Sequence, residues 1–421
     1  MKSGWFYFYN IIVHPIFTIL VYTFSLFNKK IQEGINGRKT LFIKLEEQLK
    51  KIDRTKKTFW FHSSSMGEFE QAKPIIEKLK QTTDINIVVT FFSPSGYVHS
   101  KNYPYADVIT YLPSDTVKNS KRFIKLVQPN KMIFMQYDYW PNIVWELKRN
   151  NIPTFIVDAK MAKQSKRKIF FIKQFHISLL KNFTKILTIS EDDKNSFMDF
   201  EIDGAKLLTV GDTRFDRVYQ KSLEAKTKQL INPEIVKNKK VIVLGSTWQE
   251  DEKILFPTIK KIFNGSSEVL VIIAPHEPIP NRIEELQNYF GKENTIKFSE
   301  ISTYSNQKII LIDSIGILLT LYHYADIAFV GGSFKQKIHN VLEPAVYGIP
   351  VLFGPKNKNS HEALVMINKG CGLVINNEDE AYKVLNKLIV DEKERKQIGN
   401  ISTEYVEQNI GATEKIIKEI I

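Results

Sequence analysis

Short runs of apolar residues recur along most of the chain, each followed by a turn of small residues and then by a stretch with helical spacing. Such runs are typical of strands that are buried on both faces, and their alternation with helices predicts parallel sheets covered by helices. In the first half the predicted strands are 59–62, 85–90, 131–135, 154–158 and 185–190. A second series comprises 239–246, 268–276, 308–313, 326–332 and 349–354.

These two series predict two doubly wound α/β domains. The polar and basic segment 224–239, with one proline, lies between them and is predicted to be a linker. A length of 421 residues also favours two domains, because one hydrophobic core rarely organises so long a chain. Ligands bind beyond the carboxyl ends of the strands in such sheets, so the turns after the strands are where we look for chemistry.

The N-terminal stretch 5–28 is apolar over about the length that a helix needs to cross a bilayer. Lys29, Lys30, Arg38 and Lys39 follow it, and the positive-inside rule then places the bulk of the chain in the cytoplasm. A cleaved signal peptide would have a shorter apolar region and a small-residue cleavage site. We therefore predict an uncleaved membrane anchor over residues 1–30, either spanning or deeply interfacial.

Charge and cysteine content narrow the classes of function. Lys and Arg exceed Asp and Glu by 59 to 46, and a net charge of +13 favours polyanionic partners such as anionic lipids or phosphorylated substrates. No nucleic-acid-binding motif is recognisable, so nucleic acid is not expected as a partner. The single cysteine, Cys371, excludes a disulfide framework and a cysteine-cluster metal site.

Two turns after predicted strands carry candidate chemistry. In "FWFHSSSMGEFEQ", Ser65-x-x-Glu68 fits a capping box, which is one interpretation of Glu68, and catalysis is the other. In "FVGGSFKQKIHNVLEPA", glycines precede a helix predicted to begin near Asn340 with Glu343 in its first turn. This turn can approach a phosphate and accept ribose hydroxyls, or it is a glycine turn with a second capping box. It lacks the spacing of a P-loop or a dinucleotide fingerprint.

Five stretches together carry a resemblance to a known family: "GGSFKQKIHNVLEPA", "SSSMGEFEQAKPII", "VVTFFSPSGY", "YDYWPNIVWEL" and "VGDTRFDRV". With these at suitable spacing over nearly the whole chain, the sequence resembles the Kdo transferases, 3-deoxy-D-manno-octulosonic acid transferases that build the inner core of lipopolysaccharide. The resemblance implies a GT-B glycosyltransferase of two Rossmann-like domains with a central cleft. It assigns acceptor binding to 31–223, CMP-sugar binding to 240–402, and a C-terminal helix within 403–421 that crosses back to the first domain.

The resemblance also implies the reaction. Such enzymes transfer Kdo from CMP-Kdo to a lipid A precursor, lipid IVA, with inversion and without a metal or other cofactor. They work on the cytoplasmic side of the inner membrane. Two alternatives stay open from the sequence: another GT-B enzyme, either a UDP-sugar transferase or an epimerase, and a basic membrane scaffold without catalytic activity.

Three residues match the family's catalytic positions. Glu68 corresponds to the general base, which a sugar hydroxyl requires because its pKa lies far above 7. Asp138 stands where the family usually has a glutamate and is expected to support the transition state. Arg214 replaces a commoner lysine and is expected to stabilise the departing phosphate. The alternative for Arg214 is a surface ion pair with Asp212 or Asp216.

Further residues are assigned to the two substrates by the same resemblance. On the acceptor side, Ser65 and Gly67 flank the turn, and Gly67 leaves room for a lipid-linked sugar. His276 and Ile317 stand where many relatives have arginine and glutamate, and a histidine binds phosphate more weakly near neutral pH. The set assigned to CMP is Pro275, His276, Ile315, Gly316, Ile317, Asn340, Val341, Leu342 and Glu343, with Ser246, Thr247, Gly332 and His339 as further candidates.

Segment 160–185 mixes eight Lys and Arg residues with phenylalanine and leucine. This composition suits a phosphorylated acceptor held at a membrane surface, since cations meet headgroups while aromatic side chains sit at the boundary. Lys160 and Arg167 are the best candidates for contacts with acceptor phosphate. The alternative is an ordinary solvated helix face.

Overall fold

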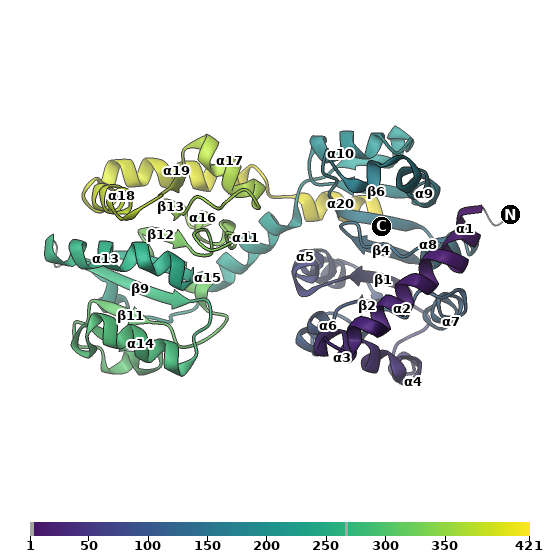
Figure 1. Ribbon diagram of the computed structural model, residues 1–421, viewed down its shortest axis with the longest axis horizontal. Coiled ribbons are helices and arrows are strands. Elements are labelled where there is room, and N and C mark those ends of the chain that lie inside the picture. Colours follow the sequence, from purple (N-terminus) through teal and green to yellow (C-terminus); the bar gives the residue numbers. More distant parts are fainter. Residues whose placement is uncertain (1–3, 266–267) are drawn as a thin grey trace. The chain divides into compact units, whose positions relative to one another are not determined.

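The computed structural model describes residues 4–265 and 268–421, which form two compact units. Unit 1 comprises 1–217 together with 410–421, and unit 2 comprises 218–409. Each unit is built on its own seven-stranded parallel sheet with helices on both faces, which confirms the predicted α/β class (Figure 1). The helix α11 (Thr213–Lys226) carries the chain from unit 1 into unit 2.

The sheet of unit 1 has the strand order β3-β2-β1-β4-β5-β6-β7. Alternate side chains of each strand face opposite layers of helices, so Trp60 and Val88 join one buried cluster while Phe61 and Val89 join the other. The strands are β1 (Lys57–Ser63), β2 (Ile85–Phe91), β3 (Val108–Tyr111), β4 (Lys131–Met135), β5 (Thr154–Ala159), β6 (Lys185–Thr188) and β7 (Leu207–Thr209).

The helical segments of unit 1 precede and connect these strands. They are α1 (Gly4–Phe8), the π-helical η1 (Tyr9–Val13), α2 (His14–Ser25), α3 (Lys29–Lys39), α4 (Leu41–Leu49), α5 (Met66–Thr82), α6 (Pro94–Ser100), α7 (Val117–Val127), α8 (Pro141–Arg149), η2 (Lys166–Lys168), α9 (Phe170–Leu180), α10 (Glu191–Met198), η3 (Gly204–Lys206) and, from the end of the chain, α20 (Ala412–Ile420).

Unit 2 repeats the architecture with the strand order β10-β11-β9-β8-β12-β13-β14. Its strands are β8 (Lys240–Thr247), β9 (Val269–Pro275), β10 (Thr295–Lys297), β11 (Ile309–Leu311), β12 (Ile327–Val330), β13 (Val351–Phe353) and β14 (Gly372–Val374). Its helical segments are α12 (Pro233–Val236), α13 (Gln249–Gly265), α14 (Pro280–Phe290), η4 (Lys292–Asn294), η5 (Phe298–Thr303), α15 (Leu318–Leu321), η6 (Tyr322–Tyr324), α16 (Leu342–Ala345), α17 (His361–Lys369), α18 (Glu378–Val390) and α19 (Glu392–Glu407).

The division between the units differs from the predicted boundaries. It falls between Arg217 and Val218, inside a helix, rather than in a linker at 224–239. The predicted linker belongs to unit 2, where Ile231 is fully buried and its backbone N–H donates to the hydroxyl of Tyr324. The buried Ile231 therefore holds in place a segment whose polar composition had predicted a linker.

The last residues of the chain complete unit 1. Ile416, Ile417 and Ile420 of α20 pack into the cluster that holds α5 on the sheet, and Figure 1 shows α20 among the elements of unit 1. Asp216 accepts hydrogen bonds from the backbone N–H groups of Gly411 and Thr413, each at 2.6 Å. The crossing back is thus made by 410–421, whereas α19, which reaches into the predicted 403–421 segment, belongs to unit 2.

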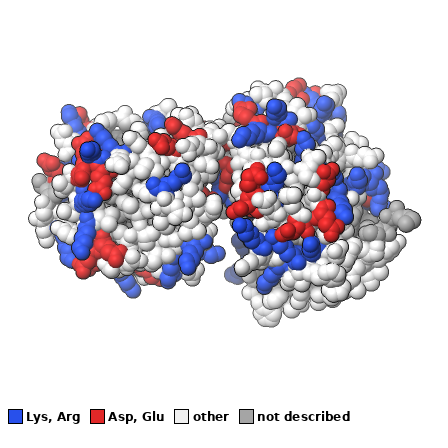
Figure 2. Space-filling view, turned by 90° about the horizontal axis from the view of Figure 1, so that it is seen from above, with Lys and Arg blue, Asp and Glu red and all other residues white. Residues whose placement is uncertain are grey.

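The apolar N-terminal helix lies against unit 1. Residues Gly4–Ser25 form one helical run that is long and apolar enough to cross a membrane by length and composition. Its Tyr9 hydroxyl donates to Asp115 at 2.9 Å, and its Asn10 amide exchanges hydrogen bonds with Asn142. Only 11% of its most apolar 18-residue stretch is buried. Figure 2 shows a broad area of unit 1 without charged side chains, and the chain has none between residues 4 and 28.

Candidate active site

The site in unit 1 begins where β1 and β4, neighbours in the sheet, reach their carboxyl ends. Ser65 is the N-cap of α5, and its Oγ accepts the backbone N–H of Glu68 at 3.4 Å. The Glu68 carboxylate in turn accepts the N–H of Ser64 at 2.5 Å. Glu68 therefore takes part in capping, as one interpretation of the sequence predicted, and its carboxylate also lies near Asp138, which follows β4.

His62 of β1, which the sequence analysis did not select, links Asp138 to the neighbouring strand β2. Its side chain is fully buried, and its Nε2 lies 3.0 Å from Oδ2 of Asp138. Its Nδ1 lies 3.1 Å from the carbonyl oxygen of Thr90 on the next strand. The same Nδ1 lies 3.0 Å from the Thr90 hydroxyl, so both ring nitrogens are engaged and the ring is held beside the Asp138 carboxylate. A lone polar residue inside the apolar run "FWFH" is the pattern that could have indicated it.

The two carboxyl groups have opposite electrostatic shifts. Burial raises the pKa of Glu68, and the nearby negative charge of Asp138 adds to this against the opposing Ser64 N–H. Burial also acts to raise the pKa of Asp138, but its hydrogen bond and charge interaction with His62 outweigh that effect, and the pKa is lowered. Opposite pKa shifts in two adjacent carboxyl groups are the arrangement in which one carboxyl can exchange a proton while the other stays ionised.

Arg214 forms an ion pair with Asp212. Its Nε lies 3.0 Å from Asp212 Oδ2, and Lys160 Nζ lies 3.8 Å from the same oxygen. This is one of the two ion pairs offered as the alternative role for Arg214; Asp216 instead holds the start of α20. Behind the pair, burial and the charge of Asp212 raise the pKa of the fully buried Asp158 to about 7.

The remaining residues predicted to bind the acceptor lie along the same edge of the sheet. The guanidinium of Arg167 stacks on the ring of Tyr137, the residue before Asp138, at 4.4 Å from the ring centroid. A Cβ at Gly67 would meet only the Ser65 side chain, at 3.8 Å, so local packing does not require a glycine there. The role of Gly67 in leaving room for the acceptor stays a prediction.

In unit 2 the predicted donor residues follow the carboxyl ends of β8, β9, β11 and β12, which are neighbours in the sheet. Gly332 has a φ of +88°, and a Cβ there would lie 2.2 Å from the carbonyl oxygen of Lys337, so only glycine fits. The loop is held by Asp251, whose carboxylate accepts the backbone N–H groups of Gly332 at 2.8 Å, Phe334 at 3.1 Å and Trp248 at 2.9 Å. Asp251 is fully buried, and the sequence analysis missed it.

Three rings stack beside this loop. The His276 ring stacks on both Trp248 and His339, with centroid separations of 4.4 and 4.6 Å. Trp248 Nε1 donates to His339 Nε2 at 3.1 Å, and burial with the nearby His276 lowers the pKa of His339 to about 4. His339 is therefore neutral at pH 7 and acts as a hydrogen-bond acceptor within the protein. Lys335 lies 3.4 Å above the Trp248 ring and, with Trp248 and Pro275, lines a cavity of about 470 Å³.

Several residues predicted to bind the donor have polar side chains that are already used in hydrogen bonds within the protein. Thr247 donates its hydroxyl to Glu252, at 2.9 Å. Asn340 accepts the backbone N–H of Leu342 at 3.1 Å and donates to Glu343 at 3.2 Å. The helix α16 begins at Leu342 with Val341 as its N-cap and no side-chain cap, so the capping box predicted for Asn340 and Glu343 is not formed.

Other members of the predicted set offer backbone rather than side chains. Val341 and Leu342 are buried, so only their main chain can reach a ligand. Ser246 and Gly316 have positive φ angles of 53° and 89° in their turns, and Ile315 beside Gly316 is 87% exposed. Ile317 precedes α15 and is partly buried.

Comparison with known proteins places the chain in a family. Residues 42–217 match the family described as 3-Deoxy-D-manno-octulosonic-acid transferase (kdotransferase). A 3-deoxy-D-manno-octulosonic acid transferase of Aquifex aeolicus is 30% identical over 82% of this chain and 90% of its own length. The chain belongs to the Kdo transferase family. A Rickettsia felis relative of the same name is 28% identical over 86% of this chain and 77% of its own length.

This Kdo transferase also shares its fold with solved GT-B proteins. The UDP-GlcNAc 2-epimerase of Neisseria meningitidis superposes with a TM-score of 0.60 at 16% identity, covering 86% of this chain and 99% of that protein. Identity this low shows the fold alone. The family match decides between the interpretations left open, and the chain is a glycosyltransferase that transfers Kdo in lipopolysaccharide biosynthesis.

Among the described residues of this Kdo transferase, no group of three or more His, Cys, Asp or Glu side chains could hold a metal ion. Lys160 and Arg214 lie beside Asp212, and Arg167 stacks on Tyr137. The structure thus brings Glu68 and Asp138 together in unit 1, and gathers the donor set in unit 2.

Proposed function

We propose that this Kdo transferase moves Kdo from CMP-Kdo to a lipid A precursor such as lipid IVA, with Glu68 as the general base. The observation that carries the proposal is the Glu68 and Asp138 pair, whose pKa values are displaced in opposite directions. Glu68 takes the proton of the acceptor hydroxyl as its oxygen bonds to the anomeric carbon of Kdo. The bond from that carbon to the CMP phosphate breaks on the opposite face, which inverts the anomeric centre.

Asp138 and Arg214 have supporting roles in this proposal. Asp138 stays ionised, and its charge makes Glu68 the more basic carboxylate. Arg214, held by Asp212, supplies positive charge for the departing phosphate. The residues of unit 2 around Gly332, His276 and Gly316 are assigned to CMP, and no metal or other cofactor takes part.

Acceptor-dependent release of CMP is the direct test. Purified protein is incubated with CMP-Kdo and tetraacylated lipid A precursor, and CMP and the glycolipid product are measured. We expect CMP release only when both substrates are present, with UDP-GlcNAc giving no turnover. Release of nucleotide from UDP-GlcNAc, or none from CMP-Kdo with the acceptor, would reject the proposal.

The pH dependence follows from the raised pKa of Glu68. The base acts only when ionised, so kcat/KM is expected to fall as the pH drops through this raised pKa, at higher pH than an ordinary glutamate would give. Asp138→Asn removes the negative charge that raises the pKa and is expected to move the acid limb to lower pH. The exposed Asp84, changed to Asn, is the control and should leave the limb in place.

For the membrane, we propose that the N-terminal helix lies in the interface of the inner membrane, with both units on the cytoplasmic side. One side of the helix contacts unit 1 through Tyr9, Asn10 and Phe17. The ring centroids of Phe17 and Trp140 are 6.1 Å apart. The neighbouring stretch 169–172 exposes four large apolar side chains, and Phe175 of α9 stacks on Tyr9. Basic residues flank that patch in the sequence, at 166–168 and 173, which favours anionic lipid over a merely solvated face.

Labelling of residue 4 distinguishes an interfacial helix from a spanning one. In a Cys371→Ser background, Gly4→Cys should stay unlabelled by a membrane-impermeant maleimide added to intact spheroplasts, and should be labelled after lysis. A spanning helix, whose cationic flank stays inside, puts residue 4 outside, where it would be labelled at once. Labelling in intact spheroplasts would therefore reject the interfacial arrangement.

A further inference from the structure

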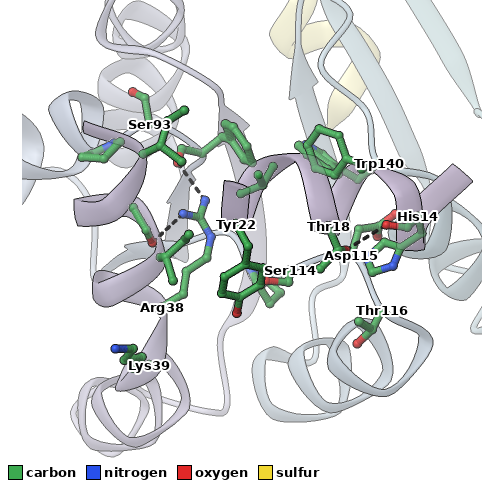
Figure 3. A pocket seen from close by; sticks show the side chains of 18 of the residues that line it. His14, Thr18, Tyr22, Arg38, Lys39, Ser93, Ser114, Asp115, Thr116 and Trp140 are labelled. Carbon is green, nitrogen blue, oxygen red and sulfur yellow. Dashed lines mark hydrogen bonds between the residues drawn. The ribbon is translucent and has the colours of Figure 1, made fainter. Parts of the chain in front are cut away.

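A second cavity in unit 1 lies beneath the N-terminal helix. It has a volume of about 660 Å³, within the range of ligand pockets, and α2, α3 and the turns after β2 and β3 form its walls. Most of the lining is apolar, including Phe17, Val21, Ile31 and Ile35. Figure 3 shows Arg38 and Lys39 toward one end of the cavity and His14, Asp115 and Trp140 toward the other.

The polar end of this cavity contains a cation without a counter-ion. Arg38 donates to three backbone carbonyl oxygens, those of Gly34, Phe92 and Leu112. Among the residues that the structure describes, no carboxylate lies within ion-pair distance of its guanidinium. Burial lowers the pKa of Arg38 to about 10, which leaves it charged at neutral pH. This partly buried guanidinium lies over the rings of Phe92 and Tyr111, and two of its five N–H donors are not used by the carbonyls. A cation in such a setting favours an anionic group.

A short run of hydrogen bonds joins the cavity wall to the proposed base. Phe92, whose carbonyl accepts from Arg38, precedes Ser93, whose N–H donates to the carbonyl of Ser64 at 2.9 Å. The N–H of Ser64 donates to Glu68. On the other side of the cavity, the ring of Trp140 stacks on that of Phe92, with 4.9 Å between the ring centroids. A molecule in the cavity therefore lies against the backbone that positions the base.

The opposite wall is the N-terminal helix, which places the cavity beside the membrane-facing surface. Val21 and Phe17 line the cavity, whereas Ile12, Ile16 and Ile19 of the same helical run are exposed. An amphiphile held in the membrane can thus insert a hydrocarbon chain beside the helix. A soluble apolar ligand has no charge to pair with Arg38. A bulk phospholipid would gain no binding free energy from lying next to Glu68.

We infer that this cavity, lined by Val21, Ile31 and Arg38, binds one acyl chain of the lipid acceptor, with the anionic head group beside Arg38. The inference rests on the proposed acceptor being a phosphorylated, acylated sugar. It assigns to the N-terminal helix a part in acceptor recognition, beyond attachment to the membrane. Each methylene that leaves water contributes about fourfold to affinity, so the chain supplies most of the binding free energy.

The test compares two acceptors that share one head group. Val21→Trp and, independently, Ile31→Trp place a large ring in the cavity. Each variant is assayed in detergent with tetraacylated acceptor and with the same phosphorylated disaccharide lacking acyl chains. The measured quantity is the acceptor preference, which is kcat/KM for the tetraacylated acceptor divided by kcat/KM for the acceptor without acyl chains. We expect both variants to lower the preference at least tenfold, and Ile19→Trp, on the exposed side of α2 at 65% exposure, to keep it.

Other outcomes separate the possible failures. If both acceptors lose activity equally, the cavity is structural and the inference fails; it also fails if the preference is unchanged. A lower affinity of the variants for phosphatidylglycerol vesicles, with an unchanged preference, would assign the cavity to bulk lipid. Wild-type protein that transfers Kdo to neither acceptor would instead reject the proposed function, and the preference would then be undefined for every variant.

Discussion

Changing Glu68 to Gln is expected to abolish Kdo transfer while leaving the fold intact. Glutamine keeps a carbonyl oxygen that can accept the Ser64 N–H, so the start of α5 retains its cap. It cannot take a proton from the acceptor, and the loss of a general base costs about 10²- to 10⁴-fold in rate. The measurement is kcat with saturating CMP-Kdo and acceptor, together with CMP affinity, which should stay at the wild-type value.

The stability of this variant separates catalysis from capping. The folded-state pKa of Glu68 is raised, so its contribution to stability is present at low pH and is lost as the pH rises through that pKa. At neutral pH a glutamine avoids this cost, and the free energy of unfolding should match or exceed that of the wild type. Ser190→Ala is the matched control: it removes the N-cap of α10, worth about 1 kcal/mol, and should retain turnover. Wild-type turnover by Glu68→Gln would show that the carboxylate only caps.

Changing Asp251 to Ala is expected to destroy binding of CMP and to destabilise unit 2. Three backbone N–H groups, those of Trp248, Gly332 and Phe334, would lose their common acceptor. An unsatisfied buried donor costs about 1–3 kcal/mol, so the summed loss is about 3 kcal/mol or more. The loop that positions Gly332 then has no fixed conformation. Calorimetric titration with CMP and denaturant unfolding measure the two effects.

Lys253, exposed on the same helix, provides the control for Asp251. Lys253→Ala should bind CMP as the wild type does and unfold at the same denaturant concentration. If Asp251→Ala loses stability but binds CMP with unchanged affinity, the loop is not part of the donor site. The separate effects of Glu68→Gln on rate and of Asp251→Ala on CMP affinity would assign the two chemical tasks to the two units.

The sequence predicted ten of the strands, and the four it missed share one property. β3, β7, β10 and β14 are the outer strands of the two sheets, and each is three or four residues long. An outer strand pairs on one side only, so it does not need the long apolar run that marks a central strand. The inner strands, which the pattern did predict, are those whose carboxyl ends carry the site.

The candidate residues divide in a similar way. Glu68 and Asp138 follow strands in small-residue turns, where a carboxylate is conspicuous. His62 and Asp251 act from inside elements: His62 occupies a buried strand position, and Asp251 is one of three acidic residues in the first turn of α13. Sequence alone does not distinguish it from Glu250 or Glu252, because what matters is which of them points at the glycine loop.

The return of 410–421 to unit 1 has a consequence for how the protein is made. Unit 2 is continuous in sequence and has emerged before α20 is synthesised, whereas the part of α5 that contacts α20 stays uncovered until Ile416, Ile417 and Ile420 arrive. Domains generally fold as units during synthesis, in the order in which they leave the ribosome. The packing around the helix that carries Glu68 is therefore completed last, so a prematurely terminated chain is expected to assemble the unit proposed to bind CMP but not the proposed acid–base centre.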